Sequence, residues 1–456
     1  MKNKEHIFLK DSEIAFDRRH RKILSYNISK YDQAVNRGKK RYSDFQAARQ
    51  YASCVKEDVV THLPEYLTQF EEQIKSRGAE VIWASDSNSA LESIGQILEE
   101  NNCRLIVKSK SMITEEIGFN EFAGELNKEA VETDLGEFIV QTAGEKPYHI
   151  LTPAMHKSKE DVARLFNLKF ELPADAPPER IAGFVRQRLR KIFREADVGV
   201  TGANFIVADI GGIGLTENEG NGLMTVSFPR LHIVLAGIER VLPSVRQLPF
   251  FFQWLGVHGT GQNLSAYNSL ILGPKTSDET DGPEKMVVIL LDNRRSKLLA
   301  EGEESLALKC IRCGACLNAC PIYKNAGGYT YASPYSGPVG SVITPFYRGF
   351  NDYGHLSFAC SLCGRCSEVC PVKIPLHELL LLNRKRKIEK FSSSVIWKHG
   401  MKAYRYAFMK RGRLDFLQGK SKNFMVSLFR SVMGDMKTLP MFAEKSFTKQ
   451  YKSLNK

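Results

Sequence analysis

The sequence predicts an α/β domain with a mostly parallel sheet, followed by a cysteine-rich helical segment and a basic helical tail. Three observations carry this prediction. Short apolar runs alternate with amphipathic segments through the first two thirds of the 456 residues, one cysteine spacing occurs twice near residues 310 and 360, and basic residues crowd the C-terminal part. Alternation of buried strands with helices is typical of parallel sheets, and a chain of this length exceeds one ordinary core.

The α/β domain is predicted over residues 70–297, after an N-terminal helical region at 1–69. Apolar residues recur at helical spacing from 42 to 78, and amphipathic segments cover 87–102 and 178–196. The predicted strands are short, β-branched and nearly continuously apolar, and they lie at 79–85, 103–109, 148–153, 203–211, 231–237 and 285–293.

Composition argues for a cytoplasmic protein. No window approaches the roughly 18 to 20 apolar residues of a membrane-spanning helix. The first 22 residues carry charges where a secretory signal has its apolar segment. In the reducing cytoplasm, clustered thiols are metal ligands or redox groups more often than disulfides.

Eight of the ten cysteines fall into two copies of the pattern C-x2-C-x2-C-x3-C-P. Three closely spaced thiolates reach three corners of an iron-sulfur cubane, and in two-cluster ferredoxins the fourth cysteine ligates the other cluster. This spacing predicts two [4Fe-4S] clusters with exchanged fourth ligands. The first set is Cys310, Cys313, Cys316 and Cys370, and the second is Cys360, Cys363, Cys366 and Cys320.

Three other interpretations of the repeat are weaker. Structural zinc prefers two separate C-x2-C pairs over a third cysteine at this spacing. Disulfides conflict with the expected compartment, and a degenerate repeat conflicts with the presence of every ligand position in both copies. Cys54 and Cys103, outside the repeat, are interpreted as packing residues.

The repeat lies in a predicted module at 303–382 whose flanks look helical. The 39 residues between the two copies exceed what a compact ferredoxin needs. The module resembles the helical ferredoxin modules of succinate dehydrogenase and heterodisulfide reductase iron-sulfur subunits. That resemblance implies an all-α module that docks on a partner supplying or removing electrons.

The segments 128–166, 198–222 and 231–244 resemble the domain shared by bacterial lactate utilization proteins. Together with the repeat and the basic tail, the order of the chain resembles the lactate utilization protein B family. This resemblance implies a ribose-phosphate isomerase/CoA-transferase type of fold. It also implies L-lactate oxidation to pyruvate with two companions, a cysteine-rich-domain protein and a second lactate utilization protein.

Two residues of the α/β domain are candidates for catalysis. Glu217, in TENEGNG, resembles the nucleophilic glutamate of CoA-transferases, although an exposed loop carboxylate is the simpler interpretation. His258, in HGTGQN, is placed on a Gly-rich loop that could bind a ligand. His232 lies inside an apolar run and is interpreted as a core histidine.

The tail, predicted over 383–456, contains most of the positive charge. Residues 371–456 hold 20 Lys and Arg against 5 Asp and Glu, and this +15 leaves about −2 for the remainder of a chain of formal charge +13. Arg384, Lys385, Lys387, Lys410, Arg411 and Arg413 lie among the aromatic residues Trp397, Tyr404, Tyr406, Phe408 and Phe416. Docking on an acidic partner subunit is the preferred interpretation, with peripheral membrane contact as the alternative and no nucleic acid expected.

The sequence as a whole indicates an electron-transfer subunit in L-lactate oxidation rather than a stand-alone catalyst. Two alternatives stay open, a subunit of a glycolate or other 2-hydroxy acid dehydrogenase and an enzyme that binds an acyl or phosphorylated ligand near Glu217. An iron-sulfur transcription regulator is a further rival, which predicts DNA binding that depends on the clusters.

Overall fold

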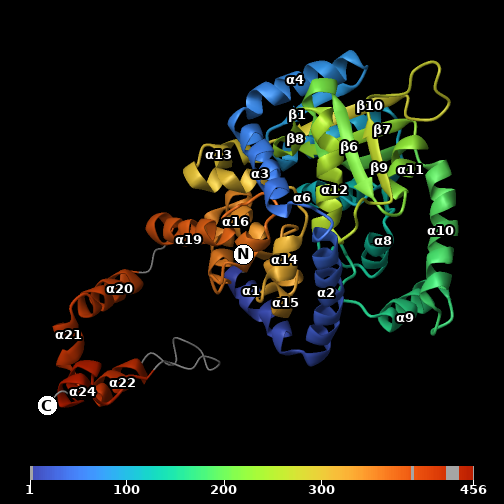
Figure 1. Ribbon diagram of the computed structural model, residues 1–456. Coiled ribbons are helices and arrows are strands. Elements are labelled where there is room, and N and C mark those ends of the chain that lie inside the picture. The colour runs from blue at the N-terminus through green and yellow to red at the C-terminus, as the bar shows by residue number, and fades with distance from the viewer. Residues whose placement is uncertain (1–3, 392–394, 428–440, 455–456) are drawn as a thin grey trace. The chain divides into compact units, whose positions relative to one another are not determined.

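The computed structural model describes residues 4–391, 395–427 and 441–454, and the chain divides into two units, 1–391 and 392–456 (Figure 1). Among the described residues, no helix is long and apolar enough to cross a membrane. The first unit combines the N-terminal helices, the α/β domain and the cysteine-rich module. The predicted boundary at 382/383 falls inside a helix, α19 (Leu376–Arg386), of the first unit.

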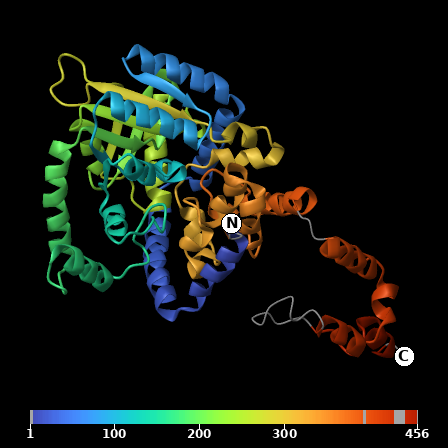
Figure 2. The ribbon, with the colours of Figure 1, turned by 180° about the vertical axis from the view of Figure 1, so that it is seen from behind.

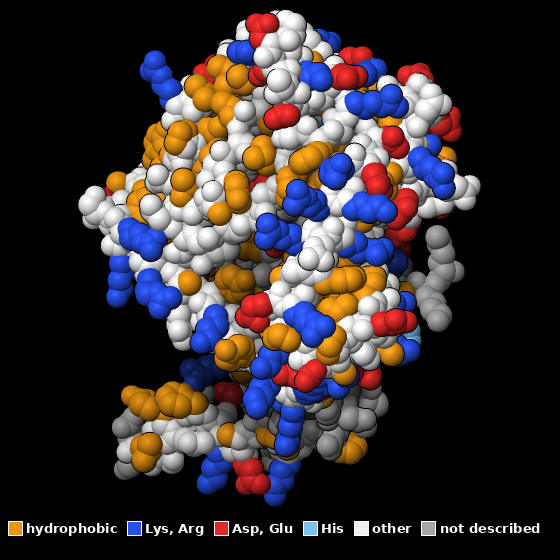
Figure 3. Space-filling model, turned by 90° about the vertical axis from the view of Figure 1, so that its right-hand side faces the viewer, with side chains coloured by type: hydrophobic (Ala, Val, Ile, Leu, Met, Phe, Trp, Pro, Cys, Tyr) orange, Lys and Arg blue, Asp and Glu red, His pale blue; other side chains and the backbone are white. Residues whose placement is uncertain are grey.

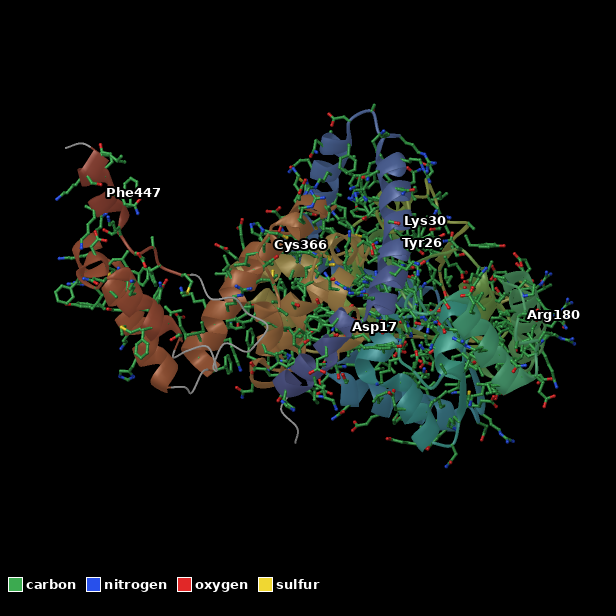
Figure 4. The ribbon with its side chains drawn as sticks, turned by 90° about the horizontal axis from the view of Figure 1, so that it is seen from below. Asp17, Tyr26, Lys30, Arg180, Cys366 and Phe447 are labelled. Atoms are coloured by element: carbon green, nitrogen blue, oxygen red, sulfur yellow. The ribbon has the colours of Figure 1, made fainter. Side chains whose placement is uncertain are left out.

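The N-terminal region is helical. Asp17 caps the long helix α2 by accepting hydrogen bonds from two backbone N–H groups of the first turn, and its carboxylate lies at that end of α2 in Figure 4. The single helical pattern between residues 42 and 78 is two helices, because Pro64 lacks an N–H group and begins a new helix after His62. The elements are α1 (Lys4–Asp11), η1 (Ser12–Phe16), α2 (Arg18–Lys39), α3 (Phe45–Thr61) and α4 (Leu63–Ser76).

A six-stranded sheet with the order β1-β10-β7-β4-β2-β3 forms the centre of the α/β domain, and every pairing is parallel. All residues of β7 and nearly all of β10 are buried, which explains their continuous apolar sequences. The strands are β1 (Glu80–Ala84), β2 (Leu105–Lys108), β3 (Glu129–Glu132), β4 (Val198–Gly202), β7 (Leu231–Gly237) and β10 (Lys285–Leu291).

Helices and a second sheet cover the two faces of the main sheet (Figures 1 and 2). One face packs against α5 (Ser87–Glu100), α6 (Met112–Ile117) and α7 (Phe119–Glu125). The other face packs against α4 and a four-stranded sheet of order β8-β5-β6-β9. Its strands are β5 (Phe205–Val207), β6 (Gly212–Glu217), β8 (Val241–Leu242) and β9 (Tyr267–Ile271).

The remaining helices of the domain lie around the sheet edges. At the β3 edge, α8, α9 and α10 enclose a separate apolar cluster, and Arg180 projects from α10 at the outer side of the domain (Figure 4). Their bounds are α8 (Leu135–Thr142), α9 (Lys159–Phe170), α10 (Pro178–Glu195), α11 (Asn221–Ser227), α12 (Leu248–Gly259), α13 (Arg295–Leu299), η2 (Ala208–Ile210), η3 (Ile238–Arg240) and η4 (Val245–Gln247).

The predicted strand at 148–153 is wrong. This segment is an irregular loop in which the Tyr148 N–H donates to the carbonyl of Pro153, and the loop packs against the cysteine-rich module. Its apolar residues are therefore buried against another part of the chain, and no strand pairing is involved. The strand that closes the β2 side of the main sheet is β3, and its short sequence EAVE lacks a continuous apolar run.

The cysteine-rich module, residues 302–391, consists of short helices packed on the N-terminal region. Helix α2 lies beside α14 and α15 (Figure 1), and the Arg49 guanidinium of α3 donates to the carbonyls of Cys370 and Ser367. The elements are η5 (Gly302–Lys309), α14 (Ala315–Ala319), α15 (Tyr323–Ala326), η6 (Tyr329–Tyr331), α16 (Gly337–Arg348), α17 (Phe350–Tyr353), η7 (Gly354–Phe358), α18 (Arg365–Val369), α19 and η8 (Lys387–Phe391).

The second unit contains α20 (Val395–Phe408), α21 (Arg411–Phe416), α22 (Gly419–Ser427) and α24 (Phe447–Leu454). Tyr404 and Phe408 stack with ring centroids 4.2 Å apart, and the Arg413 guanidinium lies over the Tyr406 ring. The aromatic and basic residues of the tail are thus partly paired with one another. The side chain of Trp397 and residues 428–440 of the predicted helical tail lie outside the described residues.

Candidate functional site

A cavity of about 570 Å³ lies at the carboxyl ends of the parallel strands. The segments that follow β2, β3, β4, β7 and β10 all contribute to its wall. Ligands in open parallel sheets bind at this edge, and the volume is typical of small-molecule sites. The wall is completed by the cysteine-rich module through Arg312, Cys313 and Tyr335.

The floor of the cavity is a buried network of charges that joins the α/β domain to the cysteine-rich module. Arg295 donates through Nε to Glu239 at 2.6 Å and through Nη1 and Nη2 to both carboxylate oxygens of Glu116 at 2.9 and 2.8 Å. From the module, Arg312 donates to Glu239 at 3.2 Å and Tyr335 donates to Glu116 at 2.5 Å. Each carboxylate therefore has partners from both parts of the chain.

The protonation state of Glu239 follows from these neighbours. Burial by itself raises the pKa of this carboxyl, but the charges of Arg295, Arg312 and Arg240 outweigh burial and lower the pKa to about 2. Glu239 is consequently a carboxylate at neutral pH. A buried ion is stable there because its oxygens are bound by guanidinium groups.

Glu217 caps a helix at the rim of the cavity. It ends β6, and its two carboxylate oxygens accept hydrogen bonds from the N–H groups of Gly222 at 2.7 Å and Leu223 at 2.8 Å. These groups belong to the first turn of α11, where an anionic acceptor stabilises the helix. The carboxylate is half-buried and bonded, which differs from the exposed loop carboxylate that the sequence favoured.

His258 is not on a loop, so its predicted placement is wrong. The apolar run before it extends α12 to Gly259, and the imidazole is fully buried, with Nδ1 donating to the carbonyl of Trp254 at 2.9 Å. Burial lowers the pKa of His258 to about 3, and the side chain does not line the cavity. His232 is likewise fully buried and bonds Thr201, as a core histidine would.

The first cysteine group of the module surrounds a small cavity beside the large one. Its wall contains apolar residues together with Cys310, Cys313, Cys316 and Cys370. Burial raises the pKa of Cys316 well above its ordinary value, and the three other thiols raise it further because they lie close by. Backbone N–H groups point at two of the sulfurs, from Arg312 to Cys310 Sγ at 3.4 Å and from Ile374 to Cys370 Sγ at 3.3 Å.

The second group brings Cys320 to the cysteines of the later repeat. Burial raises the pKa of Cys320, and the nearby Cys360 and Cys363 raise it further. Burial and the neighbouring thiols raise the pKa of Cys366 to about 12. Cys366 lies among the side chains of the helical module in Figure 4, whereas Cys363 is exposed.

This arrangement of thiols suits iron-sulfur clusters. Buried thiols with raised pKa values need cationic iron to become thiolates, and N–H groups directed at sulfur stabilise the negative charge of a bound cluster. All eight cysteines of the repeat are free, so no disulfide competes among them.

Comparisons with known proteins match two separate parts of the chain to two family models. Residues 67–291 match the LUD domain, and residues 306–374 match the 4Fe-4S dicluster domain. A lactate utilization protein B of Bacillus velezensis is 42% identical over 78% of this chain and 75% of its own length. That of Bacillus subtilis is 42% identical over 77% of this chain and 73% of its own length.

The chain belongs to the lactate utilization protein B family. Another similar protein, the "uncharacterized electron transport protein YkgF" of Escherichia coli K12, is 38% identical over 79% of this chain and 75% of its own length. A crystal structure of a DUF162 family protein of Deinococcus radiodurans covers 50% of this family member and 98% of its own chain, at 14% identity and a TM-score of 0.29. The dicluster match implies that the cofactors of this chain are two [4Fe-4S] clusters.

Several residues of the site were not found from the sequence. Arg240, Glu239 and Arg295 follow strands β7 and β10, and a polar residue directly after a buried strand is the signal that could have indicated them. Arg312 lies inside the first cysteine loop, between Cys310 and Cys313. The cluster motif specifies only the cysteine positions, so it gives no signal for this arginine. Glu116, on α6, has no such signal because its partners are distant in the sequence.

Proposed function

We propose that this protein relays electrons in the oxidation of L-lactate to pyruvate as one subunit of a complex. Membership of the lactate utilization protein B family supports the pathway, and the dicluster domain supports electron transfer. The companions would be a cysteine-rich-domain protein and a second lactate utilization protein. The parallel sheet is compatible with a ribose-phosphate isomerase/CoA-transferase type of fold, which we include in the proposal.

The ligands in this proposal are the two groups of cysteines described above, with Cys370 completing the first group and Cys320 completing the second. Once bound, the clusters would supply one-electron transfer. The protein itself contributes burial, which excludes water from most of the sulfurs, and backbone N–H groups that favour the thiolate form.

One observation carries the proposal, namely that the two cysteine groups face different surroundings. Cys313 lines the large cavity at the sheet edge, whereas Cys363 of the other group is exposed to solvent. An electron donor in the cavity would therefore lie beside the first cysteine group, and an acceptor on the surface would lie beside the second. Phe358, close in sequence to Cys360, is 48% exposed and offers an apolar contact for an acceptor.

The basic tail is proposed to dock on an acidic surface of a partner subunit. On the face drawn in Figure 3, blue and red side chains are interspersed over much of the molecule. The second unit by contrast has few acidic residues, and Tyr406, Phe416 and Phe447 are exposed on it. Contact with an anionic membrane surface is the alternative for the same helices.

The test is an anaerobic purification with iron and sulfide analysis, followed by EPR of the protein with L-lactate and the two companions. We expect about eight irons per chain, and reduction by lactate only when the companions are present. An iron-free protein would contradict the relay. Reduction by glycolate but not by L-lactate in the same assay would contradict the substrate.

A further inference from the structure

One positive charge on the wall of the large cavity lacks a partner. The other basic residues of the lining are each bound to carboxylates, as in the pairs Lys110–Asp134 and Arg295–Glu116. Arg240 forms no hydrogen bond or ion pair with any residue in the described ranges, and its Nη1 is buried without an acceptor. A buried guanidinium nitrogen without an acceptor is costly, so a ligand oxygen would stabilise it.

Hydrogen bonds from neighbouring elements hold the backbone on both sides of Arg240. The ammonium group of Lys56, on α3, is fully buried and donates to the carbonyls of Glu239 at 2.8 Å and Val241 at 3.2 Å. Val241 also pairs with Ile206 between β8 and β5. The guanidinium of Arg240 therefore starts from a rigid backbone, as a preorganised binding group requires.

A second guanidinium with an unused donor faces the same region. Arg312 is 9% exposed, and its Nη2 donates to Glu239 while its Nη1 has no acceptor. The guanidinium lies over the Tyr335 ring at 4.5 Å, which fixes its plane. Glu239 attracts Arg240 more strongly than Arg312 repels it, so both guanidinium groups lie in the field of the same carboxylate.

We propose that the large cavity binds a small organic monocarboxylate whose carboxylate is held by Arg240 and Arg312 beside the first cysteine group. Guanidinium groups bind carboxylate and phosphate oxygens alike. A monoanion fits this wall because Lys110, Arg295 and Arg312 are each in an ion pair, whereas Arg240 is the one basic residue of the described lining that is not. A dianionic phosphate ester would bring two negative charges to this single unpaired arginine.

The inference rests on the proposed function for its choice of probes, L-lactate and pyruvate. Isothermal titration calorimetry would measure the binding of each acid to the full-length protein with its iron content verified. Inorganic phosphate and the phosphate ester FMN would be titrated separately, to test whether the site prefers phosphate. We expect saturable binding of an acid, weakened about tenfold or more by Arg240→Gln, since a charge-assisted hydrogen bond is lost. The conservative variant Arg240→Lys should recover part of this affinity.

The matched control is Arg246→Gln, which makes the same exchange six residues later at an exposed arginine outside the cavity lining. Its affinity for the acid should equal that of the wild-type protein. Equal binding by Arg240→Gln, or binding of phosphate or FMN without binding of either acid, would overturn the proposal.

Failure of this site and failure of the relay give different results. An iron-loaded wild-type protein that is reduced by lactate with its companions but binds neither acid would refute the cavity site alone. A protein that binds pyruvate through Arg240 but lacks iron, or is never reduced, would refute the relay and leave the binding site in place.

Discussion

Arg312 and Leu362 occupy equivalent positions in the two cysteine repeats and share an uncommon backbone conformation. Both are left-handed, with φ of 61° and 56°. Each directs its N–H group at the sulfur two residues earlier, at 3.4 Å to Cys310 Sγ and 3.3 Å to Cys360 Sγ. The two loops thus present their thiols in the same way although their side chains differ.

Leu362→Pro is expected to prevent assembly at the second cysteine group. Proline cannot adopt a positive φ and has no N–H group to donate to Cys360 Sγ. Iron should fall from about eight to about four per chain. Leu362→Gly, which keeps the N–H group and favours the left-handed conformation, should retain nearly all of the iron. Equal iron content in the two variants would contradict a role for this backbone geometry.

Exchanges of the fourth cysteines test the crossed ligand sets. If Cys370 completes the first group, Cys370→Ser should impair the same cluster as Cys310→Ser. If Cys320 completes the second group, Cys320→Ser should impair the same cluster as Cys360→Ser. EPR spectra of the reduced variants would show which signal is lost. Cys54→Ser, at an exposed thiol outside the repeat, is the control and should leave both signals. If two variants of the same repeat, such as Cys310→Ser and Cys320→Ser, lose the same EPR signal, the crossed ligand sets are refuted.

Glu217→Gln is expected to weaken the start of α11 without abolishing lactate-dependent reduction. The amide keeps one acceptor oxygen for the N–H groups of Gly222 and Leu223 but loses the negative charge. The free energy of unfolding should fall by about 0.5–1 kcal/mol. Complete loss of reduction in an iron-loaded variant would instead indicate the nucleophile that the sequence suggested.

Stability should decrease between pH 7 and pH 5 because of the buried histidines. Burial lowers the pKa of His232 to about 3, whereas an unfolded histidine titrates near 6.5. The folded state therefore holds its histidine neutral, and the stability that is complete above pH 6.5 is lost as the pH falls toward 3. At pH 5.5 the loss is about 1 kcal/mol for each such histidine. His232→Gln should reduce this slope in urea titrations, and an unchanged slope would contradict its neutral state.

Charge reversal in the tail should weaken assembly with the companions. Replacing Lys410, Arg411 and Arg413 with Glu should reduce the affinity about tenfold or more at low salt, and the difference should shrink near ~0.5 M salt because exposed charges are screened. Analytical ultracentrifugation of the complex would measure this. The matching Gln variant should show a smaller loss, and salt-independent assembly would contradict electrostatic docking.

Four of the six strands of the main sheet, β1, β2, β7 and β10, could be predicted because buried parallel strands have a distinctive sequence. LHIVLAG and KMVVILL are apolar along their whole length and form β7 and β10. EAVE, which forms β3, has two glutamates in four residues and gives no such signal. Conversely, YHILTP has a strand-like sequence but is buried by contact with another part of the chain, which local sequence does not reveal.

The cysteine ligands could be predicted because the spacing itself reflects the chemistry of a cluster. The charge network could not, since Glu116, Glu239 and Arg295 lie on three short helical segments that follow β2, β7 and β10 and are brought together only by the fold. The partnerless state of Arg240 is likewise a property of the folded cavity. A histidine near glycines was expected on a loop, but the preceding aromatic residues continue α12 and bury His258.

The packing of the N-terminal helices on the cysteine-rich module has a consequence for the loss of the clusters. Arg49 donates to the carbonyls of Cys370 and Ser367, and Phe8 packs against Tyr331 and His355, so residues separated by more than 300 positions contact one another in this unit. Contacts of such high sequence separation form late in folding. The N-terminal helices therefore share contacts with a module whose cysteines hold the clusters, and we expect loss of the clusters to loosen these helices as well as the module.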